Sequence, residues 1–589
     1  MTQPQKPALN QTCNETSNKT LNPNLLQTIR DAVIGEGTLI ETSFGAKPLI
    51  YADYTASGRS LTFIEDYIRH QVLPFYANTH TETSFTGAQT TKLREQARQI
   101  IHKAVKGNDD DQVIFCGSGA TAAINKLIDI LNLRLPADLD AQHQLLDKIP
   151  LAQRPVVFIG PYEHHSNELP WRESIADVVV IPLNASGQID ISVLTAQLTF
   201  YSERALKIGS FSAASNVTGV KSDVDLISHL LHQHNAYSLW DYAAAAPYVG
   251  IDMNATKEFD NDADSQTADC SKDAAFISPH KFVGGPGSPG ILVVKKHLLS
   301  NSVPSMPGGG TVMYVTPDDH QFIDDHEHRE EGGTPAIIES IRAGLAVKLQ
   351  QEVGTQNIEA LEKKWVTRAL QRWSCHDNID VLGCEHAERL SIVSLRIKHQ
   401  NKDLHYAFVV ALLNDLFGIQ ARGGCSCAGP YGHTLLNMDM VLSKAIETEL
   451  GKGHLILRPG WVRLNFNYFI DDSTFEYLAS AIEMIAKDGW RLLPYYCFDT
   501  ASGTWRYQMK QMDLSSDLNE MNLGAHINHH TPEVNKRPLQ AHLNAAATEL
   551  NKCRLMEKRY DLCLTESVEA LRWFTLPQDI DTPSLQRLE

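Results

Sequence analysis

The stretch ISPHKFVGGPGSPGILVV, residues 277–294, decides the expected fold of this chain. Its first residues end an apolar run, AAFIS (274–278), and its last residues begin another, GILVVKK (290–296). Short apolar runs rich in β-forming residues are typical of buried strands. Lys281 therefore stands just after one predicted strand and before the next, in a segment whose glycines and prolines favour a turn.

Similar runs precede this stretch and alternate with helical patterns. Five further strands are expected, at 113–115, 155–160, 177–183, 206–215 and 237–241. Between the last two, SDVDLISHLLHQHN (222–235) opens with Ser and Asp before apolar residues at helical spacing, as a capped amphipathic helix does. The alternation predicts an α/β fold with a mainly parallel, seven-stranded sheet covered by helices on both faces.

The pattern divides the chain into four parts. Residues 1–45 are expected to form a disordered polar tail and a lead-in helix, and residues 46–335 the large domain, whose first strand is PLIYAD at 48–53. After a long helical stretch, the strand and helix patterns of 336–494 predict a second, smaller α/β domain. Residues 495–589 are expected to be a mainly helical extension, to which we assign no chemistry.

The composition favours a globular protein of the cytoplasm. Of 589 residues, 43% are hydrophobic, and the formal charge of −18 disfavours nucleic acid and anionic membrane surfaces as partners. No apolar run reaches the roughly 18 residues that a membrane helix needs. The start of the chain has no signal-peptide core, and the ten cysteines lack the spacing of a secreted disulfide framework. An acidic stretch at 257–273 is expected to be a solvated surface insertion.

Side chains that follow three predicted strands converge on one cofactor, pyridoxal 5'-phosphate (PLP). GSGAT (117–121) places Gly119, Ala120 and Thr121 at a helix start, where free N–H groups can hold a phosphate. Asp241 ends the strand YSLWD, and an Asp beside the pyridine nitrogen keeps that nitrogen protonated. Lys281 supplies the amine that forms a Schiff base with the cofactor. Each feature alone is commonly structural, but their joint placement predicts a PLP enzyme.

The stretch 277–294 resembles the Schiff-base segment of the class V aminotransferases, and most closely that of group II cysteine desulfurases and selenocysteine lyases. The resemblance spans about residues 45–490 and implies a PLP-dependent transferase fold of type I. It also implies that Ser278 and His280 contact the cofactor beside Lys281. EHHSNELPW (163–171) resembles the family segment whose first His, here His164, stacks on the cofactor ring.

Other segments extend the resemblance. SNVTG (215–219) implies that Asn216 reaches the cofactor and the substrate, and EEGGTP (330–335) that Gly333 and Thr334 contact the phosphate in the partner subunit of a homodimer. RGGCSCAGPYG (422–432) puts Cys427 where group II desulfurases have the cysteine that takes the sulfur, with Arg422 at the start of that loop. Arg463 matches the arginine that binds the substrate carboxylate.

The chain departs from the group II pattern at two places. Ala244 stands where a glutamine commonly contacts the cofactor, three residues after Asp241. Cys425 and Ser426 replace a His-rich entry to the cysteine loop, so that a second thiol lies two residues from Cys427 and sulfur transfer could involve either thiol.

Three hypotheses follow from these residues. The first is a cysteine desulfurase-like lyase in which Cys427 takes sulfur from cysteine, or selenium from selenocysteine, as a persulfide, releases alanine and passes the sulfur to an acceptor protein that the sequence does not identify. The second is an aminotransferase or another PLP enzyme in which Cys425 and Cys427 only pack. The third is a metal-binding protein using Cys425, Cys427 and His433, which is an incomplete ligand set, so no metal is expected.

Overall fold

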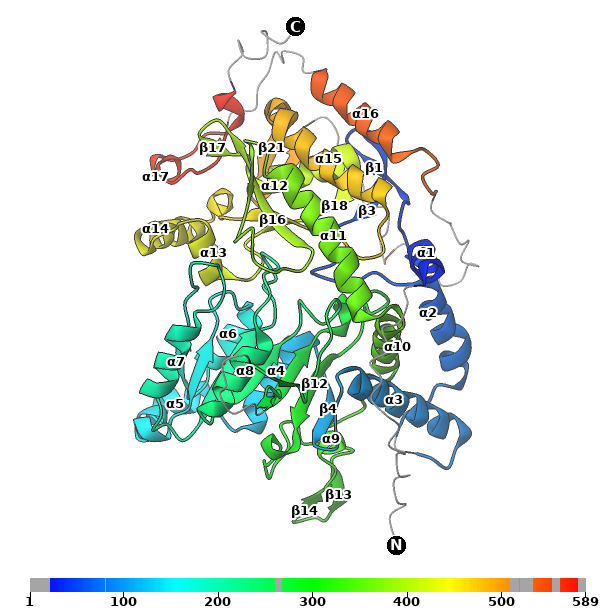
Figure 1. The fold of residues 1–589 in the computed structure, drawn as a ribbon, viewed down its shortest axis with the longest axis vertical. Coiled ribbons are helices and arrows are strands. Elements are labelled where there is room, and N and C mark those ends of the chain that lie inside the picture. Colours follow the sequence, from blue (N-terminus) through cyan, green and yellow to red (C-terminus); the bar gives the residue numbers. More distant parts are fainter. Residues whose placement is uncertain are drawn as a thin grey trace.

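The computed structural model describes residues 22–79, 81–259, 267–508, 519, 533–552 and 562–580 (Figure 1). Its largest sheet has seven strands in the order β4-β12-β11-β8-β7-β5-β6. The strands are β4 (Asp111–Cys116), β5 (Val156–Ile159), β6 (Asp177–Val180), β7 (Lys207–Ser212), β8 (Tyr237–Asp241), β11 (Ala274–Ile277) and β12 (Gly290–Lys295). β12 runs antiparallel to both of its neighbours, β4 and β11, and every other pairing in this sheet is parallel. The predicted mainly parallel, seven-stranded sheet is confirmed.

Both faces of this sheet are buried, because successive side chains of each strand point to opposite sides. Ile291 and Val293 of β12 belong to a hydrophobic cluster that includes residues of α3 (Phe85–Ala104), α7 (Ile191–Phe200), α8 (Val224–Gln233) and α10 (Ile337–Val353). Leu292 and Val294 belong to a second cluster, with α4 (Gly119–Ile130). The near-continuous apolar runs in the sequence follow from this double burial.

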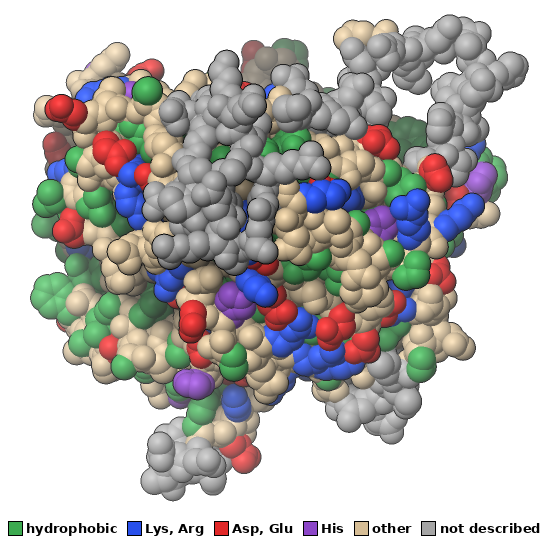
Figure 2. Space-filling model, turned by 90° about the horizontal axis from the view of Figure 1, so that it is seen from above, with side chains coloured by type: hydrophobic (Ala, Val, Ile, Leu, Met, Phe, Trp, Pro, Cys, Tyr) green, Lys and Arg blue, Asp and Glu red, His purple; other side chains and the backbone are tan. Residues whose placement is uncertain are grey.

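A smaller α/β unit lies beside the large domain, in the upper half of Figure 1. Its sheet has the order β15-β16-β20-β19, in which every pairing is antiparallel. The elements are β15 (Ile379–Val381), β16 (Ile392–His399), β19 (Arg422–Gly424), β20 (Trp461–Asn465), α11 (Thr355–Trp373), α12 (Tyr406–Phe417) and α15 (Asp472–Asp488). Arg372 of α11 binds Glu483 of α15 at 2.6 Å. Acidic and basic side chains are interspersed on the face seen in Figure 2.

The amino-terminal segment differs from its prediction. α1 (Pro23–Ala32) agrees with a lead-in helix, but β1 (Leu39–Thr42) and β2 (Gly45–Pro48) form a hairpin ahead of the predicted first strand. The expected strand at 48–53 shortens to β3 (Ile50–Tyr51), which pairs with β18 (Ile419–Gln420) of the small unit. Ile50 and Ala52 pack in the small unit's core, whereas Tyr51 between them packs against the large cluster, so this stretch contributes to both cores.

The extension after 495 is not simply helical. It begins with a hairpin of β21 (Tyr496–Asp499) and β22 (Thr504–Tyr507) and continues with α16 (Leu539–Asn551). Tyr496, Trp505 and Leu543 join the hydrophobic core of the small unit. The extension therefore enlarges that core.

Two other segments with predicted features lie partly or wholly outside the described residues. In the acidic stretch at 257–273, β9 (Thr256–Lys257) pairs with β10 (Ala268–Asp269), and residues 260–266 lie outside the described residues, as does the polar tail at 1–21. The end of this stretch is not solvated as expected, because Cys270, Lys272 and Asp273 are buried. Among the described residues, no helix is long and apolar enough to cross a membrane.

A buried carboxylate ties the starts of two central strands together. Asp273, just before β11, accepts a hydrogen bond from the Ser238 N–H (2.7 Å) and pairs with His232 (3.1 Å) and His297 (3.3 Å). Burial raises the pKa of Asp273, but the hydrogen bonds from the two histidines and from Ser238 outweigh it and lower the pKa to about 2.

We expect Asp273→Asn to lower the free energy of unfolding by about 2 kcal/mol at pH 7. A depressed carboxyl pKa stabilises the fold above about pH 4, and this contribution is lost as the pH falls towards 2. Urea unfolding of both proteins at pH 7 and pH 3 measures the difference, which should shrink at pH 3. An equal difference at the two pH values would assign the effect to packing instead.

Candidate functional site

A cavity of about 240 Å³ lies at the carboxyl ends of the sheet strands, where α/β folds bind ligands. Every residue that the sequence analysis proposed for the site lines this cavity, except Gly333 and Thr334. The residues from the large domain are Gly119, Ala120, Thr121, His164, Asn216, Asp241, Ala244, Ser278, His280 and Lys281. Arg422, Cys427 and Arg463 line it from the small unit. The structure thus brings together residues from both halves of the chain.

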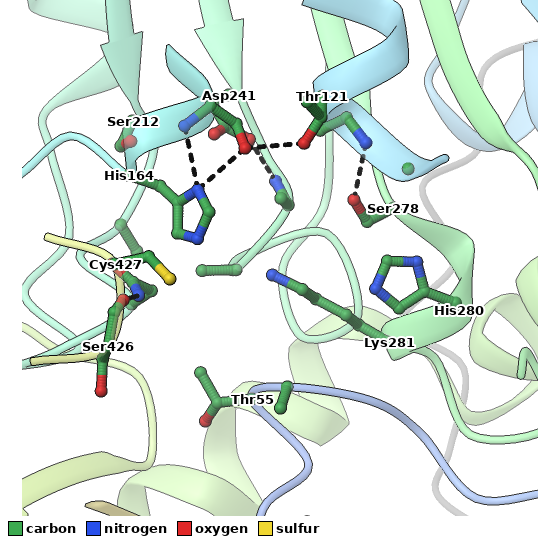
Figure 3. A pocket seen from close by; sticks show the side chains of 18 of the residues that line it. Thr55, Thr121, His164, Ser212, Asp241, Ser278, His280, Lys281, Ser426 and Cys427 are labelled. Atoms are coloured by element: carbon green, nitrogen blue, oxygen red, sulfur yellow. Dashed lines mark hydrogen bonds between the residues drawn. The ribbon is translucent and has the colours of Figure 1, made fainter. Parts of the chain in front are cut away.

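Lys281 ends a short helical turn after β11, and its amine extends into the cavity between His164 and His280 (Figure 3). Burial lowers the pKa of this amine to about 8, an effect that the nearby Asp241 opposes and that Arg463 strengthens. Near neutral pH, the uncharged fraction of the Lys281 amine is therefore larger than that of an ordinary lysine amine. The uncharged amine is the form that attacks an aldehyde.

Asp241 is buried at the end of β8. One of its oxygens accepts a hydrogen bond from the Ala243 N–H at 2.8 Å. Burial raises the pKa of Asp241, while the Ala243 N–H and the Lys281 amine oppose that shift. A carboxylate in this setting stabilises a cationic N–H group placed against it.

The start of α4 borders the cavity with Gly119, Ala120 and Thr121. Its N-cap, Ser118, makes no side-chain capping hydrogen bond, and the Ala120 N–H donates to Ser278 Oγ at 2.8 Å. Gly119 has φ +58°, and a Cβ added there would lie 2.9 Å from Ser278 Oγ, so the close approach requires glycine. A helix start with a free cap favours an anion such as a phosphate.

A chain of hydrogen bonds joins α4 to His164 (Figure 3). Thr121 Oγ1 lies 2.6 Å from Ser166 Oγ, which lies 3.0 Å from His164 Nδ1. Burial, and then the neighbouring Lys281, lower the pKa of His164 to about 4. The His164 ring is therefore neutral at physiological pH and presents a flat, uncharged surface to the cavity.

Two arginines share one carboxylate that the sequence analysis missed. Asp53 binds Arg463 at 3.0 Å and Arg422 at 2.9 Å. Arg463 is buried and also donates to the Asn216 backbone oxygen at 2.9 Å. Asp53 ends the predicted strand PLIYAD, so the rule that singled out Asp241 at the end of YSLWD could have identified it.

The cysteine loop follows β19 and reaches the cavity through Ser426 and Cys427. The Cys427 sulfur and the Lys281 amine point toward one another across the cavity in Figure 3. Cys425 does not line the cavity and packs against the large hydrophobic cluster instead. Within the described ranges, no group of three or more His, Cys, Asp or Glu side chains is arranged to hold a metal ion.

Gly333 and Thr334 are exposed and do not line the cavity. The segment before them is anchored by Glu331, whose carboxylate binds Arg94 (2.5 Å) and Arg98 (3.0 Å). Glu331 also accepts a hydrogen bond from the Phe115 N–H of β4 at 2.6 Å. These contacts of Glu331 anchor the segment that precedes the two exposed residues.

Comparisons with known proteins agree with this geometry. A probable cysteine desulfurase of Halalkalibacterium halodurans is 28% identical over 400 residues, which cover 67% of this chain and 87% of that protein. One of Staphylococcus aureus is 26% identical over 406 residues, covering 68% and 87%.

Solved structures share the fold. A cysteine desulfurase of Escherichia coli matches with a TM-score of 0.58 and 20% identity, covering 80% of this chain and 99% of that one. The apo cysteine desulfurase of Thermococcus onnurineus also matches with a TM-score of 0.58 and 20% identity, covering 74% and 95%. The model of the family described as aminotransferase class-V matches residues 50–442. Together with the lysine, aspartate and helix start gathered around one cavity, this match shows that the chain belongs to the class V aminotransferase family, whose members use PLP in general.

Proposed function

We propose that this protein is a PLP-dependent cysteine desulfurase, which removes sulfur from cysteine, or selenium from selenocysteine, and releases alanine. The observation that carries the proposal is the placement of a free thiol, Cys427, in the same cavity as the Lys281 amine. The relatives named probable cysteine desulfurase, in which the match covers most of their length, support it.

The residues of the cavity fit the cofactor. The free start of α4, with Thr121, suits the phosphate, Lys281 the aldehyde carbon and Asp241 the pyridine nitrogen. Asn216 Oδ1 and Thr55 Oγ1 are buried and have no hydrogen-bond partner among the described residues, which indicates unfilled polar positions in the cavity wall. Ala244 leaves one commonly used contact empty. Asn216 Nδ2 does not replace it, because this atom donates to the Ser426 backbone oxygen at 2.8 Å.

The residues that line the cavity have separate roles in the proposed reaction. When bound, PLP supplies an electron sink for bonds broken next to the amino group of the substrate. The Arg463 guanidinium, held by Asp53, binds the substrate carboxylate and turns the sulfur toward Cys427. His164 covers one side of the site as a neutral ring, and the Lys281 amine would carry protons within the cavity.

The sulfur step requires the thiolate of Cys427. Its sulfur attacks the sulfur of the substrate, the bond between that sulfur and Cβ breaks, and the electron pair stays with Cβ. A proton then adds to Cβ, so that alanine leaves and Cys427 retains a persulfide. The chemistry needs a reduced thiol, which the cytoplasm maintains.

Product analysis tests the proposal. The PLP-loaded protein is incubated with cysteine and dithiothreitol, and alanine and sulfide are measured with and without a keto acid. Equal amounts of alanine and sulfide, independent of the keto acid, are expected. Amino transfer that requires the keto acid and yields no sulfide would favour the alternative, an aminotransferase in which Cys427 only packs.

Asp53→Asn should weaken substrate binding, since the amide no longer carries the charge that fixes Arg422 and Arg463. We expect the KM for cysteine to rise about tenfold, equivalent to about 1.4 kcal/mol, with a smaller change in kcat. Asp252→Asn, at an exposed ion pair with Lys106, is the matched control and should leave both constants unchanged. An unchanged KM in Asp53→Asn would show that the arginines do not depend on this carboxylate.

We further propose that the protein works as a homodimer. The exposed Gly333 and Thr334 have no role in their own cavity, and the outer surface near α3 carries exposed aromatic side chains. These are Phe63, Tyr67, Phe75, Tyr76 and Phe85. Exposed apolar groups of this extent mark protein interfaces, and isologous dimers are the commonest oligomers.

Sedimentation should give twice the chain mass, and Phe85→Asp should shift the protein toward monomer with weaker PLP retention. The exposed Phe200→Asp, on α7, is the matched control. A fully active monomer at assay concentration would contradict the dimer.

A further inference from the structure

Two adjacent histidines at the start of α6 (His165–Arg172) serve two different parts of the site. His164, the N-cap, lines the cavity, and its neighbour His165 contacts the cysteine loop. The Gly429 N–H donates to His165 Nε2 at 3.0 Å, and the His165 N–H donates to the Cys427 backbone oxygen at 2.9 Å. His165 thus bonds to both sides of Ala428, directly after the proposed nucleophile.

The loop needs such support. Ser426 and Cys427 have φ values of +54° and +57°, a left-handed conformation that costs L-residues other than glycine free energy. Two consecutive residues of this kind persist only where their surroundings hold them. The contacts that hold them include the two hydrogen bonds of His165 and the bond from Asn216 Nδ2 to the Ser426 oxygen. Within the loop, the Ala428 N–H also donates to the Cys425 oxygen at 3.3 Å.

We propose that His165 is a positioning residue, which fixes the Cys427 loop to the same helix start that carries His164. Its ring acts as a hydrogen-bond acceptor at Nε2, so it must be neutral, with its hydrogen on Nδ1. His165 touches neither the cofactor cradle nor the substrate arginines among the contacts of the described chain. The His165 ring also lies 6.3 Å from the His164 ring, centroid to centroid, while its hydrogen bonds go to the loop.

The arrangement joins the nucleophile to the phosphate cradle. Thr121 at the start of α4 contacts Ser166, Ser166 contacts His164, and His165 holds the loop. Residues 164–166 therefore link the cradle, the ring-covering histidine and the thiol-bearing loop in one short rigid segment. The position of the Cys427 sulfur relative to the cofactor is set by this segment.

The test compares His165→Gln with His165→Asn, two variants that differ by one methylene. The Gln oxygen can reach the place of Nε2 and accept from Gly429, whereas the shorter Asn cannot. Hydrogen exchange of the peptide covering 425–432 should be about fivefold faster in His165→Asn than in the parent, as for one lost hydrogen bond, and close to the parent in His165→Gln. Leu169→Ala, on the exposed face of α6, should leave this exchange unchanged.

Kinetics add a second readout, which rests on the proposed desulfurase function. In His165→Asn, kcat for alanine formation should fall about fivefold while the KM for cysteine stays constant, and His165→Gln should restore kcat. Equal exchange rates in all variants, or a KM change with no kcat change, would overturn the positioning role. If the parent forms no alanine, the desulfurase proposal fails, yet the exchange rates still decide the role of His165.

Discussion

Lys281→Ala is expected to abolish covalent attachment of PLP and to lower turnover by roughly 10³-fold or more. The variant has no amine to form the bond with PLP that the substrate amine displaces. The parent protein should absorb visible light as a lysine-linked PLP protein. After borohydride reduction, its peptide containing Lys281 should carry the cofactor mass. The variant should show neither signal, although the phosphate cradle at α4 can still retain the cofactor without a covalent bond.

Lys296→Ala is the matched control. This lysine is exposed just after β12, at the end of that strand away from the cavity. Its loss should leave both the absorbance and the labelled peptide intact. Labelling of any other lysine in Lys281→Ala would show that the amine was assigned to the wrong residue.

Local sequence pattern predicted the part of the site that depends on strand ends. Asp241 and Lys281 each follow a run of buried β-rich residues, and parallel strands bring their carboxyl ends to one edge of the sheet. The fold and the positions of these two residues can therefore be predicted from the sequence of each segment by itself. The same holds for the glycine-rich start of α4, because tight turns and free helix starts leave a clear pattern.

Contacts between distant segments were not predictable in this way. Asp53 and Arg463 are 410 positions apart, and no local pattern says that they meet. The pairing of β3 with β18 places Ile50 and Ala52 in the small unit's core, although these apolar residues resemble those of any buried strand. The β21–β22 hairpin was overlooked for a related reason, because such short strands leave only a weak pattern.

The cysteine loop was predictable from the sequence only in part. The resemblance placed Cys427 in this loop. The left-handed conformation of Ser426 and Cys427 and the hydrogen bonds with His165 form only in the folded protein, where the loop contacts α6. The separation of the two thiols is also a tertiary effect. Cys427 lines the cavity, and Cys425, two residues earlier, packs away from it. The structure therefore favours Cys427 as the thiol that meets the substrate.

Cys427→Ala should remove alanine formation from cysteine, by roughly 10³-fold or more, while leaving PLP attachment and cysteine binding intact. Only the acceptor of the sulfur is lost, since Lys281, Asp241 and Arg463 are unchanged. In the parent, mass spectrometry after a turnover without reductant should find one extra sulfur on the peptide containing Cys427. The absorbance change on adding cysteine should persist in the variant and show that the substrate still binds.

Cys425→Ala is the matched control and should retain most of the activity, because this thiol lies outside the cavity. A large loss in Cys425→Ala with normal persulfide formation on Cys427 would instead make Cys425 a relay that passes the sulfur onward. If both variants released alanine at the parent rate, the thiols would have no part in the reaction. The aminotransferase alternative would then stand, with its requirement for a keto acid, and the assignment of Lys281 and Asp241 to the cofactor would be unaffected.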